Sequence, residues 1–156
     1  MAQYFFDSSA LVKYYHAEIG TERVASIFGE PDRKIRISRI GLVEMQSALA
    51  MKVRSGVLQQ AAAALQRQRL LPDVAASVLE VSKVTEEHFA MAERLIARHS
   101  FLSRLRTLDA IQLAVALDLA DQQLVDQFVV ADRVLAEMAA IEPAGTPWAQ
   151  GGGRCR

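Results

Sequence analysis

The sequence has almost no cysteine: Cys155, one residue from the end of the 156-residue chain, is the only one. A single cysteine has no partner within the chain, which excludes a disulfide framework and a cysteine-based metal site. A protein of this composition suits a reducing compartment, and we expect it to act in the cytoplasm.

The chain also lacks an excess of charge and a long apolar run. Eighteen Lys and Arg residues balance eighteen Asp and Glu residues, so any contact with nucleic acid must come from local basic patches. The longest apolar stretch, AIQLAVALDLA, is interrupted by Gln112 and Asp118 and falls short of the ~20 residues of a membrane-spanning helix. Asp7 interrupts the first apolar run, so no secretion signal is indicated. The sequence therefore predicts no membrane association.

What the sequence does contain is an alternation of strand-like and helix-like segments. The expected strands are residues 3–6, 33–38, 77–84 and 127–132, and the expected helices are 9–18, 21–28, 39–56, 57–71, 85–100, 106–121 and 133–140. This order predicts an α/β three-layer sandwich, with a mostly parallel central sheet flanked by helices. We expect residues 1–142 to form one domain and the Gly-rich residues 143–156 to form a flexible tail.

Some local details follow from single residues. Ser38 and Thr107 are predicted to cap the helices that follow them. Pro72 is predicted to stop or kink its helix, because proline lacks the backbone N–H that an interior position requires. The segment RKIRIS alternates charged and apolar residues, which predicts a strand with one solvent-exposed face.

Two aspartates follow expected strands and precede expected helices. Asp7 ends the first strand and Asp132 ends the last one. In a parallel sheet both positions lie at the carboxyl edge, where open α/β folds bind ligands. Each aspartate could instead be no more than a helix N-cap.

Two further acids stand at unusual helix positions. The neighbours of Glu44 three and four positions away are small or apolar, so this acid projects from an apolar helix face and needs a partner. That partner could be an arginine such as Arg39. Asp109 lies in the first turn of its helix among apolar residues, although first-turn acids often only complement the helix dipole.

Four acids that converged would repel one another strongly unless a divalent cation neutralised them. Convergence of Asp7, Glu44, Asp109 and Asp132 thus predicts a metal site. All-oxygen ligands favour Mg²⁺ or Mn²⁺ over zinc. His16, His88 and His99 are widely separated along the chain, and we interpret them as surface or packing residues.

The motifs FFDSSALVKYY, SRIGLVEMQSAL, LRTLDAIQLAVAL and FVVADRVL, in this order, resemble the acidic motifs of PIN-domain ribonucleases. They are similar in particular to those of the VapC-type toxins of bacterial toxin–antitoxin pairs. The resemblance spans roughly residues 3–140. It implies a PIN-like fold and a Mg²⁺- or Mn²⁺-dependent endoribonuclease that hydrolyses RNA phosphodiester bonds.

The resemblance also implies roles for single residues. Asp7, Glu44 and Asp109 would be the catalytic, metal-coordinating acids, Asp132 the fourth and often outer acid, and Ser9 the hydroxyl that steadies the first site. Thr107 would support the helix that carries Asp109. Family members often carry Thr or Ser two residues before the fourth acid, whereas this chain has Val130, so a hydrogen bond beside Asp132 is expected to be missing.

Basic residues gather in two places along the sequence. They are Arg33, Lys34, Arg36 and Arg39 in one group, and Arg98, His99, Arg104 and Arg106 in the other. Such groups can be solvated surface or phosphate contacts. Arg104, Arg106, Arg39 and Lys13 are the candidates for RNA binding. With 6% aromatic residues, base stacking is not indicated, and recognition of tRNA or another structured RNA by shape fits better.

The resemblance further implies two protein partners, a cognate antitoxin and a second copy of the chain in a homodimer. Other readings of the residues remain open. A receiver-type magnesium-binding signalling domain would need paired acids after the first strand and a lysine at the last one, where this chain has Asp7, Ser8 and Asp132. A haloacid-dehalogenase-type phosphatase would need an aspartate in place of Ser9. A catalytically inactive binding module with the same fold would differ only in lacking turnover.

Overall fold

The computed structural model of the chain describes residues 1–142; the predicted tail, with Cys155, lies outside the described residues. Within residues 1–142 there are four strands, β1 (Gln3–Phe6), β2 (Lys34–Ser38), β3 (Glu80–Ser82) and β4 (Gln127–Val129). They form one sheet in the order β3-β2-β1-β4, and every neighbouring pair is parallel. The predicted mostly parallel sheet is confirmed.

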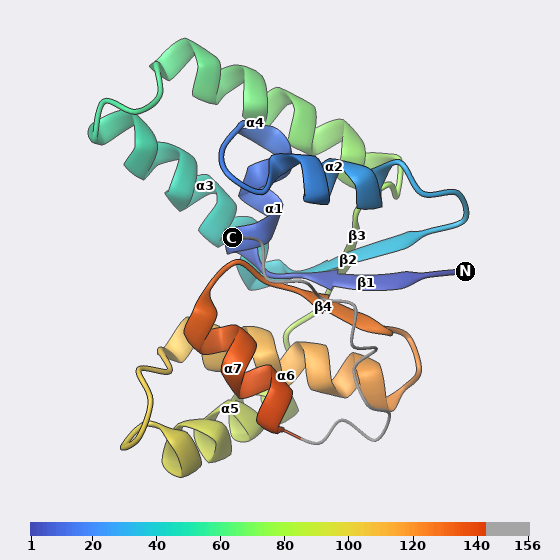
Figure 1. The fold of residues 1–156 in the computed structure, drawn as a ribbon, viewed down its shortest axis with the longest axis vertical. Helices are drawn as coiled ribbons and strands as arrows, with labels where there is room; N and C mark the ends of the chain where they lie inside the picture. The colour runs from blue at the N-terminus through green and yellow to red at the C-terminus, as the bar shows by residue number, and fades with distance from the viewer. Residues whose placement is uncertain (143–156) are drawn as a thin grey trace.

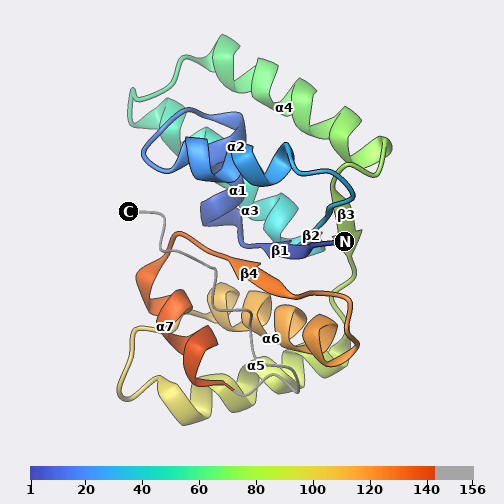
Figure 2. The same ribbon diagram turned by 45° about the vertical axis from the view of Figure 1, so that its right-hand side comes forward.

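Helices connect the strands and cover both faces of the sheet (Figures 1 and 2). In the described part of the chain they are α1 (Ser8–Tyr15), α2 (Thr21–Phe28), α3 (Arg39–Arg54), α4 (Gln60–Ala75), α5 (Glu86–His99), α6 (Thr107–Asp121) and α7 (Arg133–Ile141). The first four lie on one face and the last three on the other, which confirms the three-layer sandwich.

Each face of the sheet has its own hydrophobic core. Because side chains alternate along a strand, Tyr4 and Phe6 pack on the side of α1 and α2, whereas Phe5 packs with Phe128 on the side of α6. Helix α6 is buried over most of its length from Ala110 to Ala120, since the sheet, α5 and α7 surround it. This explains its apolar sequence. Within residues 1–142, no helix is both long and apolar enough to cross a bilayer.

Helix α4 continues through Pro72 to Ala75 and is not stopped there. The turn beyond the proline is held by tertiary contacts that the local sequence does not contain. The Tyr15 hydroxyl donates a hydrogen bond to Asp73 Oδ2 at 2.6 Å, and Val74 packs against the α1–α2 core. These contacts offset the backbone hydrogen bond that proline cannot make.

The prediction of a solvent-exposed face for β2 is wrong at Arg36. This side chain is buried, and its Nη2 lies 2.9 Å from Glu80 Oε2 on β3. Its Nη1 donates to the carbonyl of Leu124 and, at 3.2 Å, to Gln3 Oε1. Arg36 therefore ties three strands together and is a structural residue of the sheet.

Candidate active site

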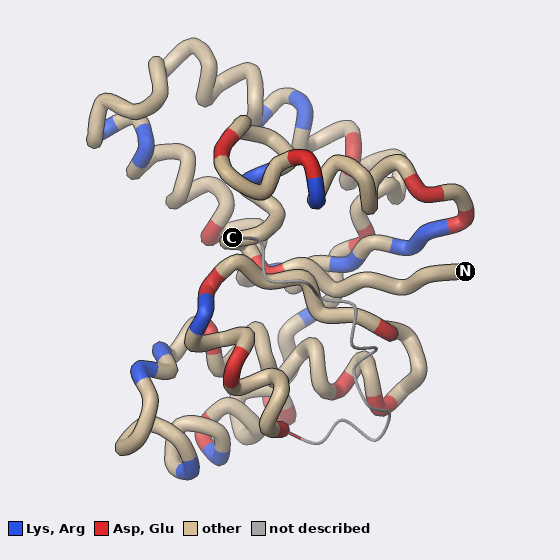
Figure 3. Tube along the Cα trace, in the orientation of Figure 1, with Lys and Arg blue, Asp and Glu red and all other residues tan. Residues whose placement is uncertain are grey.

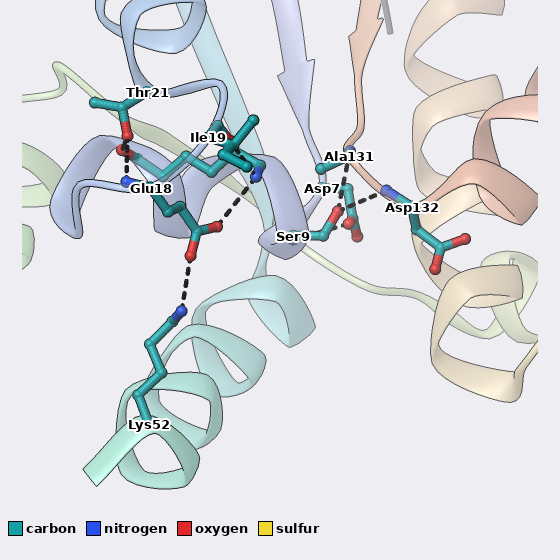
Figure 4. Close-up of polar contacts among 9 residues, drawn as sticks. Asp7, Ser9, Glu18, Ile19, Thr21, Lys52, Ala131 and Asp132 are labelled. Atoms are coloured by element: carbon teal, nitrogen blue, oxygen red, sulfur yellow. Dashed lines mark hydrogen bonds and ion pairs between the residues drawn. The ribbon is translucent and has the colours of Figure 1, made fainter. Parts of the chain in front are cut away.

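The four predicted acids lie at the carboxyl edge of the sheet and on the helices that start there. Asp7 follows β1 and Asp132 follows β4, and these two strands are hydrogen-bonded neighbours. The backbone N–H of Asp7 donates to the carbonyl of Val129 at 3.0 Å, which closes the gap between the two strand ends. Figure 4 shows Asp7 beside Asp132, with the Ser9 hydroxyl joined by dashed lines to the backbone at Ala131 and Asp132.

Asp7 is the N-cap of α1 as well as a buried carboxylate. Its Oδ2 accepts a hydrogen bond from the backbone N–H of Ser9 at 2.9 Å, and the residue is 3% exposed. Burial raises the pKa of the Asp7 carboxyl, and the charge of Asp132 adds to this effect, while hydrogen bonds from Ser9 and Ser8 oppose it. A cap needs no burial, so capping alone does not account for this position.

Ser9 connects the first acidic motif to the last. Its Oγ accepts hydrogen bonds from the backbone N–H groups of Ala131 at 3.1 Å and Asp132 at 3.3 Å. Asp132 in turn caps α7, because its Oδ1 accepts from the N–H of Leu135 at 3.0 Å. Val130 offers no hydroxyl, but Ser9 reaches the same turn from the neighbouring strand end (Figure 4).

Glu44 projects from α3 and is held by two polar side chains. Its Oε2 accepts from the amide Nε2 of Gln112 at 2.7 Å and from the hydroxyl of Ser8 at 3.2 Å. None of the ion pairs found within residues 1–142 joins Glu44 to Arg39, which is exposed. Burial raises the pKa of Glu44, and the charges of Asp7 and Asp109 raise it further, against the hydrogen bonds that the carboxylate accepts.

Asp109 lies in the first turn of α6, which begins directly after the N-cap residue Arg106. Thr107 is the first helical residue, so the prediction that it caps α6 is wrong; the cap position is Arg106, whose side chain makes no capping hydrogen bond. Burial raises the pKa of Asp109, and the charges of Asp7 and Asp132 add to it, while the Arg106 guanidinium opposes it.

The structure thus brings Asp7, Glu44, Asp109 and Asp132 close enough for their charges to interact, and none of them takes part in an ion pair within the described residues. As the side chains stand, no group of three or more His, Cys, Asp or Glu residues in this part of the chain is arranged to hold a metal ion. The donor set itself fits a divalent cation: the pKa values of the buried Asp7 and the partly buried Glu44 and Asp109 are raised, and a hard cation would stabilise their ionised forms.

The predicted basic residues differ in their surroundings. Arg104 and Arg106 are exposed in the segment between α5 and α6, next to the helix that carries Asp109, and Arg39 is exposed at the start of α3. Figure 3 shows acidic positions around the starts of α1, α3 and α7 and basic positions along the α5–α6 segment. Lys13 Nζ instead lies 3.1 Å from Glu18 Oε1 and donates to the carbonyl of Ile19 at 2.7 Å.

A family model described as the PIN domain matches residues 4–141 of this chain. The chain belongs to the PIN-domain family. The matched residues include all four acids. This is evidence from the sequence, separate from the proximity of the acids in the structure. No curated protein sequence matches the chain.

Solved structures share the fold of this PIN domain at low sequence identity. Mycobacterium tuberculosis VapC20, described as a sarcin-ricin loop cleaving toxin, is 16% identical with a TM-score of 0.64, covering 86% of this chain and 93% of its own. A Pyrobaculum aerophilum protein is 20% identical with a TM-score of 0.59, and the alignment covers 88% of this chain and 84% of that protein. Rickettsia felis VapBC2, solved bound to a DNA fragment from its promoter, is 13% identical with a TM-score of 0.56. The alignment covers 87% of this chain and 92% of the VapBC2 chain.

Sequence reasoning missed the polar residues that surround the acids. Ser8, Ser38, Gly41 and Gln112 all belong to the hydrogen-bonded surroundings of Glu44. One signal was visible, because Gln112 is a lone amide in the apolar run of α6. A buried amide requires hydrogen-bond partners, and a search for them would have led to Glu44.

Proposed function

We propose that this PIN domain is a Mg²⁺- or Mn²⁺-dependent endoribonuclease and the VapC-type toxin of a toxin–antitoxin pair. The observation that carries the proposal is the cluster of Asp7, Glu44, Asp109 and Asp132 at the carboxyl edge of the sheet, where burial and the neighbouring acids raise the pKa values of Asp7, Glu44 and Asp109. A cluster of this kind costs stability unless a cation neutralises it. The fold shared with VapC20 and VapBC2 supports the assignment.

In this proposal Asp7, Glu44 and Asp109 hold the cation, and Asp132 supports the site from the start of α7. The chemistry that a divalent cation supplies when bound is Lewis-acid catalysis of phosphodiester hydrolysis, with a water of lowered pKa as the nucleophile. Ser9 keeps the turn before Asp132 against the start of α1 through its two backbone contacts. Attack by water leaves a 5′-phosphate and a 3′-hydroxyl, whereas attack by the RNA's own 2′-hydroxyl leaves a cyclic phosphate.

Cleavage of RNA by the purified protein tests this function. Incubation with a pool of structured RNAs, tRNA included, is expected to give cuts with 5′-phosphate ends in the presence of Mn²⁺ or Mg²⁺ and none in EDTA. Asp109→Asn protein, purified in the same way, controls for contaminating nucleases. Cyclic phosphate ends, or cuts that persist in EDTA, would contradict the mechanism. Tight Mn²⁺ binding without turnover on any RNA would favour the inactive binding module.

The RNA is expected to enter along the segment between α5 and α6. Arg104 and Arg106 are exposed there, and the Arg106 charge already acts on Asp109. In the same segment Phe101 is 92% exposed and Leu102 94%. Phe101 thus offers a base-stacking surface beside two phosphate-binding groups, which the low aromatic content did not suggest. Arg39 lies at the start of α3, whereas Lys13 is already engaged by Glu18.

Removing the two arginines is expected to weaken RNA binding without changing the chemistry. With Mn²⁺ at saturation, so that Asp109 stays ionised without the Arg106 charge, the Arg104→Ala, Arg106→Ala double variant should raise KM for RNA about tenfold at nearly constant kcat, because phosphate contacts supply uniform binding. The slope of log affinity against log salt should fall by about one per arginine. Arg54→Ala, Arg67→Ala, which removes two exposed arginines from α3 and α4, is the matched control. Equal losses in both double variants would contradict a local RNA site.

The toxin assignment also brings protein partners, an antitoxin and a second copy of the chain. Large apolar side chains are exposed on α3, α4 and their connection, which supports protein contacts on this side of the sheet; they are Val43, Met51, Val57, Leu65 and Leu71. The cytoplasm, where structured RNAs are available and a lone cysteine stays reduced, is the proposed place of action.

A further inference from the structure

Gln112 is a fully buried amide in the middle of the apolar helix α6, with 0% of its surface exposed. Apart from Asp109, one turn earlier, its neighbours in the helix are apolar, and the amide finds its partners on other elements. Its Oε1 accepts from the hydroxyl of Ser38 at 2.5 Å, and its Nε2 donates to Glu44 Oε2 at 2.7 Å. A buried polar side chain costs stability unless it is hydrogen-bonded, and each end of this amide has one partner.

The orientation of the Gln112 amide follows from the partners at its other end. The backbone N–H of Gly41 donates to Ser38 Oγ at 2.9 Å, so the Ser38 hydroxyl hydrogen is free to be donated onward. It is donated to the only acceptor of the amide, Oε1, which turns the amide N–H group toward Glu44. The polarity runs in one direction, from the start of α3 through Ser38 and Gln112 to the carboxylate.

Gly41 leaves the space that this arrangement needs. A Cβ at position 41 would lie 2.8 Å from Gln112 Nε2 and 2.6 Å from Ile37 Cγ1, which is closer than such atoms can approach. The first turn of α3 is therefore packed directly against the amide. An alternative position for the Gln112 side chain would disturb the packing around Gly41 and Ile37.

The effect on Glu44 is one-sided. Both of its donors, Gln112 Nε2 and the Ser8 hydroxyl, bind the same oxygen, Oε2. Among the hydrogen bonds of residues 1–142, none is accepted by Oε1. One oxygen of the carboxylate is thus anchored to α6 and α1, and the other remains able to accept a ligand.

We propose that Gln112 is a positioning residue, which holds Glu44 through Oε2 so that Oε1 can bind the divalent cation. This rests on the proposed metal site but not on RNA cleavage. Partners that orient metal ligands are known to matter nearly as much as the ligands themselves, and their loss typically weakens metal binding about 10- to 100-fold.

Mn²⁺ binding to the full-length protein, measured by calorimetry in the absence of RNA, tests the proposal. Gln112→Met keeps the size of the side chain and removes both hydrogen bonds. Its Kd for Mn²⁺ is expected to rise about tenfold or more. Gln66→Met is the matched control, because Gln66 is a partly buried glutamine on α4 that contacts His16. The control is expected to leave the Kd unchanged.

A double-mutant cycle with Glu44→Gln separates positioning from a general structural role. If Gln112 acts through Glu44, Gln112→Met should change the Kd little in the Glu44→Gln background. A full additional loss there would overturn the proposal, as would an unchanged Kd in Gln112→Met alone. Circular dichroism establishes that each variant is folded.

Should Gln112→Met fail to fold, Ser38→Ala tests the same relay with a smaller change, and it is expected to raise the Kd several-fold. The experiments distinguish failure of the positioning role from failure of the proposed nuclease function. Wild-type protein that binds Mn²⁺ but cuts no RNA would refute the nuclease and leave the positioning role to be decided by the cycle. Wild-type protein that binds no Mn²⁺ would overturn both.

Discussion

Replacing Asp7 by asparagine is expected to abolish RNA cleavage while making the metal-free protein more stable. Loss of a cation-holding carboxylate should lower kcat on the order of 10³-fold, equivalent to several kcal/mol of transition-state stabilisation. The asparagine amide oxygen can still accept the hydrogen bond from the Ser9 N–H, so α1 keeps its cap. What the substitution removes is a buried negative charge near Asp132, Glu44 and Asp109.

The stability effect should depend on pH, and its sign follows from the raised pKa of Asp7. A folded-state pKa above the unfolded value of 3.8 means that the folded protein binds more protons than the unfolded one. The stability of the wild type therefore falls as pH rises from about that value through the folded-state pKa. In EDTA, Asp7→Asn should be more stable than wild type at pH 7 by on the order of 1 kcal/mol, and the difference should vanish near pH 3.5.

Urea unfolding at both pH values, with and without Mn²⁺, measures this. Mn²⁺ at a hundredfold excess over Kd should stabilise the wild type, which binds the ion, by about 2.7 kcal/mol. The variant, which has lost a ligand, should be stabilised less. The order of stability is therefore expected to reverse. Asp32→Asn, at an exposed turn before β2, is the control and should change neither quantity. An Asp7→Asn protein that is less stable than wild type in EDTA at pH 7 would contradict the buried-charge argument.

Replacing Arg36 by methionine is expected to destabilise the sheet by about 2–3 kcal/mol. Methionine fills similar space but leaves Glu80 and the Leu124 carbonyl without the guanidinium that now binds them. Removing one partner of a buried pair typically costs about 3–5 kcal/mol. The cost is expected to be smaller here, because the Glu80 side chain is 36% exposed and can be partly hydrated. The loss corresponds to a decrease in Tm of about 4–12 °C.

Thermal and urea denaturation of the variant provide the measurement. Lys34→Met, at an exposed position of the same strand, is the control for loss of one positive charge and should change stability by less than about 0.5 kcal/mol. Adding Glu80→Gln to Arg36→Met removes the unpaired carboxylate and should restore part of the loss. An Arg36→Met protein as stable as wild type would show that the ion pair contributes nothing to the sheet.

The residues that ended strands were the most predictable part of the site. Asp7 and Asp132 each follow a short apolar segment, and parallel strands bring their carboxyl ends to one edge whatever the details of packing. Asp109 and Glu44 were found because acids stand out in apolar helix faces. Thr107, by contrast, was predicted to cap a helix whose N-cap position is Arg106, since propensity cannot say which of two adjacent residues takes the cap position.

The surroundings of the acids could not be predicted, because they depend on residues far apart in the chain. Ser9 meets the backbone at Ala131 and Asp132, and Gln112 meets Ser38 and Glu44, across separations that no local pattern encodes. The continuation of α4 through Pro72 has the same origin, because Tyr15 binds Asp73 from another helix.

By itself, then, the sequence determined the order of strands and helices, the parallel sheet and the placing of Asp7 and Asp132 at one sheet edge. These follow from periodicity, chain connectivity and the cost of burying charge, all of which act locally or by general rule. Only the tertiary structure decided which oxygen of Glu44 is anchored, why position 41 is a glycine and why Arg36 is buried. Each of these depends on the close approach of distant segments, and close approach is a property of the packed chain.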